Sequence, residues 1–254
     1  IQENIGDGVS VMSLEEYASN LPEDDDWGPM EHVAVVTATG MIDRGESGSS
    51  FPFGRVMGSG SVCDALRQAA SQPGARAIVL RIDSGGGDAL ASADMYHTVE
   101  EIMNEGIPVV VSMGGVAASG GYYMACGADR IFADRMTVTG SIGIISGKFA
   151  FGDMLDSLGV TVEEVSTGPM AGMYSPFRRF SDAERQRAFE LMHDGYVLFV
   201  ETVADGRGMT FQEVDSIGRG RVWSGTDALN LGLVDQLGGI ADAVMYAAES
   251  SGMD

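Results

Sequence analysis

Apolar residues gather into short runs that alternate with amphipathic stretches from residue 33 onward. The clearest run, ARAIVLRID at 75–83, is almost continuously apolar, which is typical of a parallel strand covered on both faces. Further strands are predicted where β-branched residues cluster, at 33–42, 108–113, 130–133 and 160–165, with glycine-interrupted β structure over 137–151.

The stretches between these runs have helical spacing. Two helices are predicted to begin at capping boxes, one from Ser181 to Glu184 and one from Thr210 to Glu213. The first of them carries an apolar stripe from Phe189 to Val203, which we interpret as a packing face because the opposite face is acidic. Other helices are predicted at 61–71, 88–104, 118–127, 152–158, 224–230 and 240–249, with a glycine-serine loop at 45–60. This order predicts an α/β fold with a mainly parallel sheet, followed by helical elements.

The first thirty residues differ from the rest. They are polar and broken, so we predict a linker or N-terminal arm over 1–30, holding at most a short helix at 14–17, before one folded domain over 31–254. No apolar run approaches the roughly 20 residues that a membrane helix needs. Because the chain opens with Ile1, we expect a processed product or a piece of a longer protein, whose membrane anchor would lie upstream.

Charge and cysteine content exclude several classes of protein. The chain has 37 acidic and 15 basic residues, a formal net charge of −22. A field this negative opposes binding to nucleic acid, which depends on cationic contacts to phosphate. Cys63 and Cys126 lack the spacing of metal ligands, and we expect both as buried free thiols. The sequence predicts neither a metal nor an organic cofactor.

Two glycine-rich turns follow apolar strands and precede helices: DSGGGD at 83–88 and GGVAASGG at 114–121. In a parallel sheet, ligands collect where strands end and helices begin. The turns could simply be tight connections, or their N–H groups could face an anion. A phosphate site is disfavoured because neither turn has a P-loop or dinucleotide fingerprint. The third interpretation is an oxyanion hole, with Ser119 beside it as the nucleophile.

Three longer runs carry a family resemblance: IVLRIDSGGGDALAS, VVVSMGGVAASGGYYMA and TVTGSIGIISGKF. They resemble signal peptide peptidase A and its relatives, Ser/Lys peptidases with a Clp-protease/crotonase type of fold built on repeated ββα units. The likeness extends from Val33 to the C-terminus. It implies that Ser119 is the nucleophile, that the N–H groups of Gly120 and of the Gly86–Gly87 turn form the oxyanion hole, and that Ser141 hydrogen-bonds a catalytic lysine. It also implies apolar peptide substrates such as remnant signal peptides, a homo-oligomer, and a place at the bacterial membrane, with this domain itself soluble and outside the cytoplasm.

The family's general base is missing from its usual place. Single-domain relatives hold the lysine in the stretch matching 165–176, which here reads VSTGPMAGMYSP, with Ala171 at the aligned position. Tandem relatives carry the lysine in their first half and the serine in their second, and this chain resembles a second half. We therefore expect the base to come from another domain or chain. Lys148, which is the only lysine, is the rival candidate.

Other functions stay open at this point. A chain without a base could be a peptide-binding scaffold that has lost catalysis. A crotonase-type acyl-CoA enzyme would use a similar oxyanion hole, but the AASGG turn with its serine argues against it. A Ser–His arrangement would need His32, His97 or His193 beside Ser119, and these three lie in different predicted elements.

Overall fold

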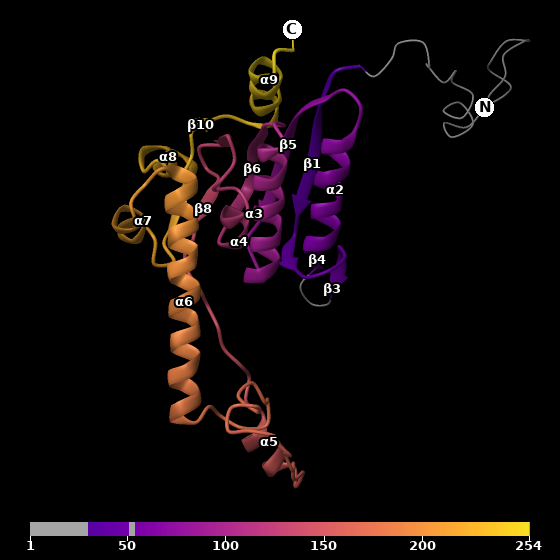
Figure 1. Cartoon of the computed structure of the whole chain (residues 1–254). Coiled ribbons are helices and arrows are strands. Elements are labelled where there is room, and N and C mark those ends of the chain that lie inside the picture. The colour runs from indigo at the N-terminus through magenta and orange to yellow at the C-terminus, as the bar shows by residue number, and fades with distance from the viewer. Residues whose placement is uncertain (1–29, 51–53, 254) are drawn as a thin grey trace, which may run out of the picture. The chain divides into compact units, whose positions relative to one another are not determined.

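The computed structural model describes residues 30–50 and 54–253. The described residues from Glu31 onward form one unit, drawn in colour in Figure 1. The linker or arm predicted over 1–30, with its short helix at 14–17, falls almost entirely outside the described residues and stays a prediction.

A mainly parallel sheet organises this unit. Its five successive neighbours are β1 (His32–Thr39), β5 (Ala75–Ser84), β6 (Val109–Ala118), β7 (Arg130–Ala133) and β10 (Gln236–Leu237), all parallel. The far end of β6 also pairs in parallel with β8 (Val138–Gly140), which pairs antiparallel with β9 (Val222–Ser224). The predicted α/β fold with a mainly parallel sheet is therefore confirmed.

Helices cover both faces of the sheet. Alternate β5 residues Ile78 and Leu80 pack into the larger core under α2 (Ser59–Ser71) and α3 (Ala89–Asn104). Ala77 and Val79, which point the other way, pack under α9 (Ile240–Ser250). All four β5 side chains are fully buried, which is why this strand is apolar at nearly every position.

Two sequence predictions near the N-terminal half are wrong. The stretch 45–60 is not a loop throughout. It contributes β3 (Gly48–Ser50) and β4 (Gly54–Gly58) to a small second sheet with β2 (Met41–Asp43). The second glycine-rich turn is largely strand, because β6 continues through Gly114 and Gly115 to Ala118 by pairing with β8. Helix α4 (Gly120–Tyr123) is correspondingly much shorter than predicted.

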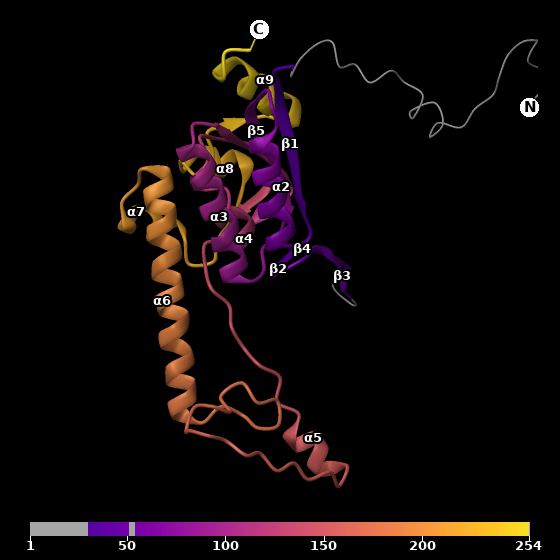
Figure 2. The same cartoon turned by 45° about the vertical axis from the view of Figure 1, so that its right-hand side comes forward.

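Residues 144–195, called the extension below, leave the sheet. They contain α5 (Gly152–Ser157) and the first half of α6 (Asp182–Arg207), and both views place them away from the strands (Figures 1 and 2). The strand predicted at 160–165 is irregular and exposed here. The predicted packing stripe on α6 is buried only in its second half: Phe199 is 2% exposed, whereas Phe189 is 61% exposed. Met192 and Tyr196 are half-buried, and within the described residues it is Phe189 that stays uncovered.

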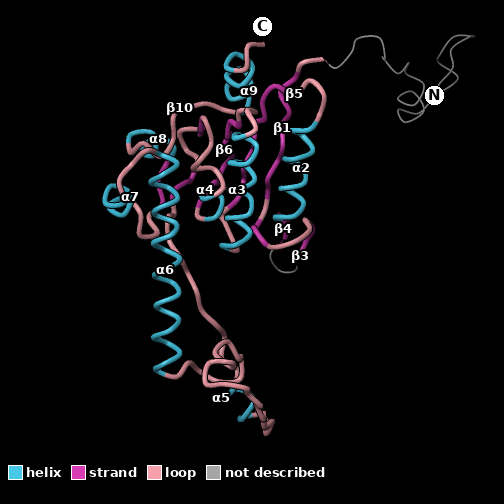
Figure 3. The backbone as a smooth tube through the Cα atoms, in the orientation of Figure 1, coloured by secondary structure: helices cyan, strands magenta, loops and turns pink. Residues whose placement is uncertain are grey.

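The C-terminal elements follow the sequence more closely. The capping boxes at Ser181 and Thr210 are both formed, and they start α6 and α7 (Phe211–Ile217) as predicted. Helix α8 (Gly225–Asn230) is also found where predicted. Figure 3 shows how these helices are joined by short loops, in contrast to the long loops of the extension.

Candidate active site

Ser119 lies where β6 ends and α4 begins. Its backbone has φ 53° and ψ −121°, a conformation that residues other than glycine rarely adopt. Its carbonyl accepts hydrogen bonds from the N–H groups of Tyr122, at 2.9 Å, and Tyr123, at 2.8 Å. The residue is half-buried, and its hydroxyl makes no hydrogen bond to any described residue. A strained strand-to-helix turn of this kind presents a nucleophile to substrate.

Ser141 lies beside Ser119 at the end of the neighbouring strand. Strands β6 and β8 pair with Ala118 opposite Gly140, and the Ser119 N–H donates to the Gly140 carbonyl at 2.9 Å. Ser141 also has a positive φ, 50°, and its N–H donates to the Arg221 carbonyl at 2.7 Å. The structure therefore brings together two serines that are 22 positions apart in the sequence.

The glycine turn after β5 closes over the same point. Gly86 has φ +99°, and a Cβ built on it would lie 2.7 Å from the Gly120 nitrogen and 2.8 Å from the Ser119 Cβ. Only a glycine allows the two backbones to approach this closely. Strand β2 holds the turn in place, because the Ile42 N–H donates to the Gly86 carbonyl and the Asp88 N–H donates to the Ile42 carbonyl, both at 3.0 Å.

Free N–H groups are present beside Ser119. The Gly86 N–H is occupied, since it donates to the Ser84 Oγ at 3.1 Å. The N–H groups of Gly87 and Gly120 make no hydrogen bond within the described chain. Gly120 directly follows Ser119, and Gly87 directly follows the glycine that approaches Ser119, so these two unbound donors are candidates for an oxyanion hole. The geometry thus favours Gly87 and Gly120 as donors, with Gly86 providing the close approach.

Asp88 and Arg44 support this turn from outside. The sequence predicts Asp88 as a helix cap beside the glycine turn, but it does not predict Arg44 there. Asp88 caps α3 by accepting the Ala91 N–H at 2.9 Å. Arg44, which follows β2, places its Nε 3.1 Å from each Asp88 carboxylate oxygen. The hydrogen bond from Arg44 lowers the pKa of Asp88. No sequence pattern distinguishes Arg44 from the other arginines, because its partner lies 44 positions away.

Lys148 is engaged elsewhere. Its Nζ donates to the Met173 carbonyl at 2.8 Å and stands 4.3 Å from the centre of the Phe180 ring. Both partners belong to the extension. Within the described chain, Lys148 contacts neither Ser119 nor Ser141, so its ammonium holds the extension together rather than facing the nucleophile.

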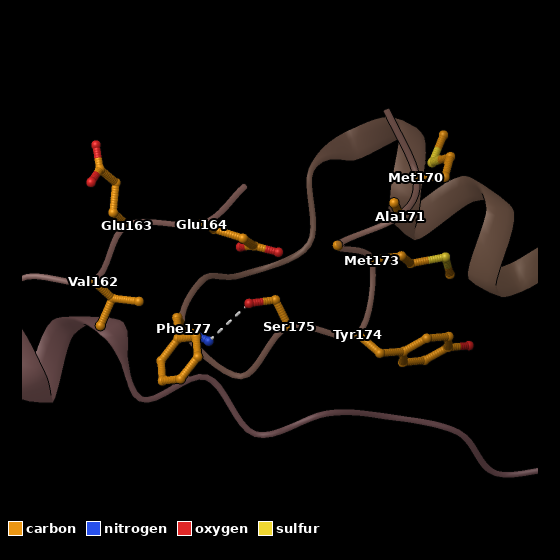
Figure 4. A pocket seen from close by; sticks show the side chains of 10 residues that line it. Val162, Glu163, Glu164, Met170, Ala171, Met173, Tyr174, Ser175 and Phe177 are labelled. Atoms are coloured by element: carbon orange, nitrogen blue, oxygen red, sulfur yellow. Dashed lines mark hydrogen bonds between the residues drawn. The ribbon is translucent and has the colours of Figure 1, made fainter. Parts of the chain in front are cut away.

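Ala171 lines a cleft of about 360 Å³ in the extension (Figure 4). Apolar side chains such as Met170 and Phe177 line it together with Glu163 and Glu164. In Figure 4 the Ala171 methyl group stands beside Met170 and Met173. The position that the family resemblance aligns with the lysine therefore belongs to the extension, not to the sheet that carries the two serines.

The remaining sequence candidates lie elsewhere. His32 contacts Gln72 and His97 contacts Glu100, while His193 is exposed on α6. Both cysteines are free and buried, as predicted. In residues 30–50 and 54–253, no group of histidines, cysteines and carboxylates is arranged to hold a metal ion. Over the same residues, no helix is both long enough and apolar enough to cross a membrane.

Comparison with known proteins gives consistent matches. The sequence profile of peptidase family S49 matches residues 101–254. Protease 4 of Salmonella typhi is 41% identical over 217 residues, covering 85% of this chain and 34% of that protein. Protease 4 of Haemophilus influenzae is 35% identical, covering 95% and 38%. A putative signal peptide peptidase SppA of Enterococcus faecium is 32% identical, covering 93% and 65%.

Among solved structures, a ClpP1 variant from Listeria monocytogenes matches with a TM-score of 0.55 and 15% identity, covering 83% of this chain and 94% of that one. This likeness confirms the Clp-type fold expected from the sequence. The chain spans about a third of the length of Protease 4 in both species.

Proposed function

The chain belongs to peptidase family S49, and from that premise we propose that it is the serine-bearing part of a Ser/Lys endopeptidase that cleaves apolar peptides. The carrying observation is the site at the end of β6. This site contains the strained Ser119 with Ser141 on the neighbouring strand. It also contains the unbound N–H groups of Gly87 and Gly120. Residues 31–254 would form the peptidase domain.

The geometry supports a two-step mechanism. A base takes the Ser119 proton while Oγ attacks the peptide carbonyl, and the resulting oxyanion receives hydrogen bonds from Gly87 and Gly120. Collapse of this intermediate breaks the peptide C–N bond, and the protonated base donates its proton to the leaving amine. Water activated by the same base then hydrolyses the acyl-serine. Each well-placed donor contributes about 3–4 kcal/mol to stabilising the transition state.

The base in this proposal is a lysine from another domain or chain. The only lysine of this chain is bound to Met173 and Phe180. A lysine arriving at Ser119 would be partly desolvated, which lowers its pKa and lets it accept a proton near neutral pH. Ser141, with its hydroxyl unbound within the described residues, would receive the amine and orient it.

Assembly is part of the same proposal. The extension exposes Ile145 (100%), Val165 (96%) and Phe149 (80%), side chains that isolated domains rarely leave in water together. A second copy, or a lysine-bearing upstream domain, would cover them. Apolar peptide substrates such as remnant signal peptides occur at the bacterial membrane, so we place the enzyme there, outside the cytoplasm, with its anchor in another part of the protein.

The absent base also favours a second candidate, a scaffold that binds apolar peptides without cleaving them. The two candidates differ in the reactivity of Ser119. We expect the protein, combined with a lysine-bearing half, to digest casein and to be labelled on Ser119 by a fluorophosphonate. The Ser119→Ala variant should do neither. Undiminished digestion by pure Ser119→Ala would exclude Ser119 as the nucleophile, and absence of both reactions in the complemented wild type would favour the scaffold.

A further inference from the structure

A hydrogen-bonded cluster lies behind Ser141, where α6, α7 and the turn at 218–221 meet. The Tyr196 hydroxyl on α6 donates to Asp215 Oδ1 on α7 at 2.7 Å and accepts the Arg219 N–H at 3.2 Å. The Arg219 side chain returns to the same carboxylate, with its Nε 3.3 Å from Asp215 Oδ1. Asp215 consequently has its pKa lowered to about 2, first by Arg219 and then by Tyr196.

The turn that this cluster holds is the one that fixes Ser141. The Arg221 carbonyl accepts the Ser141 N–H at 2.7 Å, and the Gly220 N–H donates to the Ile142 carbonyl at 2.7 Å. A side chain at Gly143 would have no room, since its Cβ would lie 2.9 Å from the Gly220 backbone. The turn and the Ser141 segment are therefore locked as one piece of backbone.

The backbone is strained both in the 218–221 turn and at Ser141, the two segments that these hydrogen bonds join. Arg219 has φ 57° and Ser141 has φ 50°, two of the three positive values among described residues other than glycine. Each such conformation costs on the order of 1–3 kcal/mol and persists only where neighbouring contacts over-determine it. Around Arg219, the contacts that do so come from Tyr196 and Asp215.

Tyr196 also stands at a boundary within α6. The residues before it belong to the extension, where Phe189 and Leu191 are exposed, whereas Phe199 and Val200 after it are buried in the core. The hydroxyl that supports the turn is thus carried by the first part of α6 that touches the body of the domain. A shift of the extension would reach Ser141 through this residue.

We propose that Tyr196 is a positioning residue that acts through Asp215 and the 218–221 turn to hold Ser141 beside Ser119, and so couples the extension to the site. The inference deepens the proposed function and rests on it for the role of Ser141. Its structural part, the dependence of the Ser141 backbone on the Tyr196 hydroxyl, does not require any activity.

Hydrogen exchange of the whole chain, measured by mass spectrometry, tests the structural part. In Tyr196→Phe, amides over 139–143 and 218–221 should exchange about five to ten times faster than in the wild type, because the turn loses a hydrogen-bond acceptor. Tyr96→Phe is the matched control. It also removes a tyrosine-to-carboxylate hydrogen bond, 2.9 Å to Glu100, but on α3. Unchanged protection at 139–143 in Tyr196→Phe would overturn the inference.

Kinetics of the complemented enzyme test the consequence. We expect Tyr196→Phe to lower kcat about tenfold with KM nearly unchanged, because a displaced Ser141 misplaces the base but not the peptide. Tyr96→Phe should leave both constants close to wild type. A raised KM with unchanged kcat, or a wild-type kcat despite faster exchange, would overturn the proposal.

Two further variants complete the experiment, one as a substitute for Tyr196→Phe and one that tests the proposed function separately. Asp215→Asn preserves the size of the side chain and an acceptor for Tyr196 but loses the charge that binds Arg219. We expect it to show the same faster amide exchange and the same lower kcat, and it replaces Tyr196→Phe if that variant does not fold. Ser119→Ala separates the two levels of inference. If Ser119→Ala retains activity, the proposed function fails, whereas a normal Tyr196→Phe enzyme alongside an inactive Ser119→Ala enzyme removes only the positioning role.

Discussion

Single residues at the site are held in backbone conformations that the sequence does not reveal. Ser119 and Ser141 both have positive φ, yet serine has no preference for it. The glycines that permit this arrangement, Gly86 above all, were recognisable because three glycines in a row after an apolar strand are unusual. Which of their N–H groups remains free is decided by Ser84, whose hydroxyl occupies the Gly86 donor. Which glycine N–H group is unbound therefore depends on the folded turn and is not predicted by the sequence.

Replacing Ser119 tests its strain separately from its chemistry. Ser119→Ala and Ser119→Gly should both abolish peptidase activity of the complemented enzyme, because each lacks the hydroxyl. Glycine also relieves the backbone, so Ser119→Gly should be about 1 kcal/mol more stable than Ser119→Ala, after allowing for the greater entropy of unfolded glycine. Thermal unfolding then separates the variants by roughly 2–4 °C. Equal melting temperatures would show that the conformation is not strained.

Lys148→Met distinguishes the two possible sources of the base. Because the Lys148 Nζ is bound to the Met173 carbonyl and the Phe180 ring, its loss should weaken the extension by about 1 kcal/mol. Turnover of casein by the complemented enzyme should stay within about twofold of wild type, as for other substitutions away from the site. If turnover stops while circular dichroism shows an intact fold, Lys148 is the base and the in-trans assignment is wrong.

At the scale of helices and strands, sequence prediction succeeded where the residues of one element alone determine its structure. β5 reads as a two-sided buried strand because Ala77 to Leu80 face two cores. The capping boxes fix the starts of α6 and α7. Prediction failed where pairing decides the outcome: β6 extends through Gly114 and Gly115 because β8 pairs with it, and β4 forms between β2 and β3. At 160–165 the β-branched residues find no neighbouring strand, so their propensity alone does not produce one.

The junction between the extension and α6 should respond to acid. Arg178 binds both carboxylate oxygens of Glu184 at 2.7 Å, and the Ser181 N–H donates to Glu184 as well. Arg178, followed by Ser181, lowers the pKa of Glu184 from 4.5 to about 2. A depressed carboxyl pKa contributes stability that is complete above 4.5 and is lost as pH falls toward 2. The extension should therefore loosen between pH 4.5 and 2.

Pepsin digestion across that range measures the loosening. Cleavage within 144–181, relative to cleavage of the same chain unfolded in urea, should rise as pH falls in the wild type. Glu184→Gln should be cleaved at a nearly constant relative rate, because its amide does not titrate. Glu190→Gln removes an exposed pair with Arg187 on the same helix and should keep the wild-type profile. A flat wild-type profile would show that the Arg178–Glu184 pair does not stabilise this junction.

For the whole molecule, net charge and exposed apolar surface have opposite effects on the association of copies of the chain. The formal charge of −22 makes copies of the chain repel one another. The extension offers exposed apolar side chains that gain by being covered. Sequence patterning predicted one packing stripe on α6 from Phe189 to Val203, and its C-terminal part is buried whereas Phe189 is exposed. Packing of that side chain requires a partner that residues 30–50 and 54–253 do not supply, and the pattern of one sequence carries no information about what provides it.

Assembly through the extension can be tested with charge. Ile145 and Val165 are 100% and 96% exposed, so Ile145→Asp and Val165→Asp should leave the melting temperature of the isolated chain unchanged. In an assembly each buried carboxylate would be unpaired, which costs several kcal/mol and should dissociate it. We expect light scattering to show complexes of the wild-type chain and smaller species for the double variant. Casein turnover by the complemented enzyme should be lost in parallel, because the lysine of the proposed mechanism would no longer reach Ser119. Met245→Asp, at an exposed apolar position on α9, is the control and should preserve both mass and turnover. Dissociation without loss of turnover would place the base within one chain, and an unchanged mass for the double variant would show that copies meet through another surface.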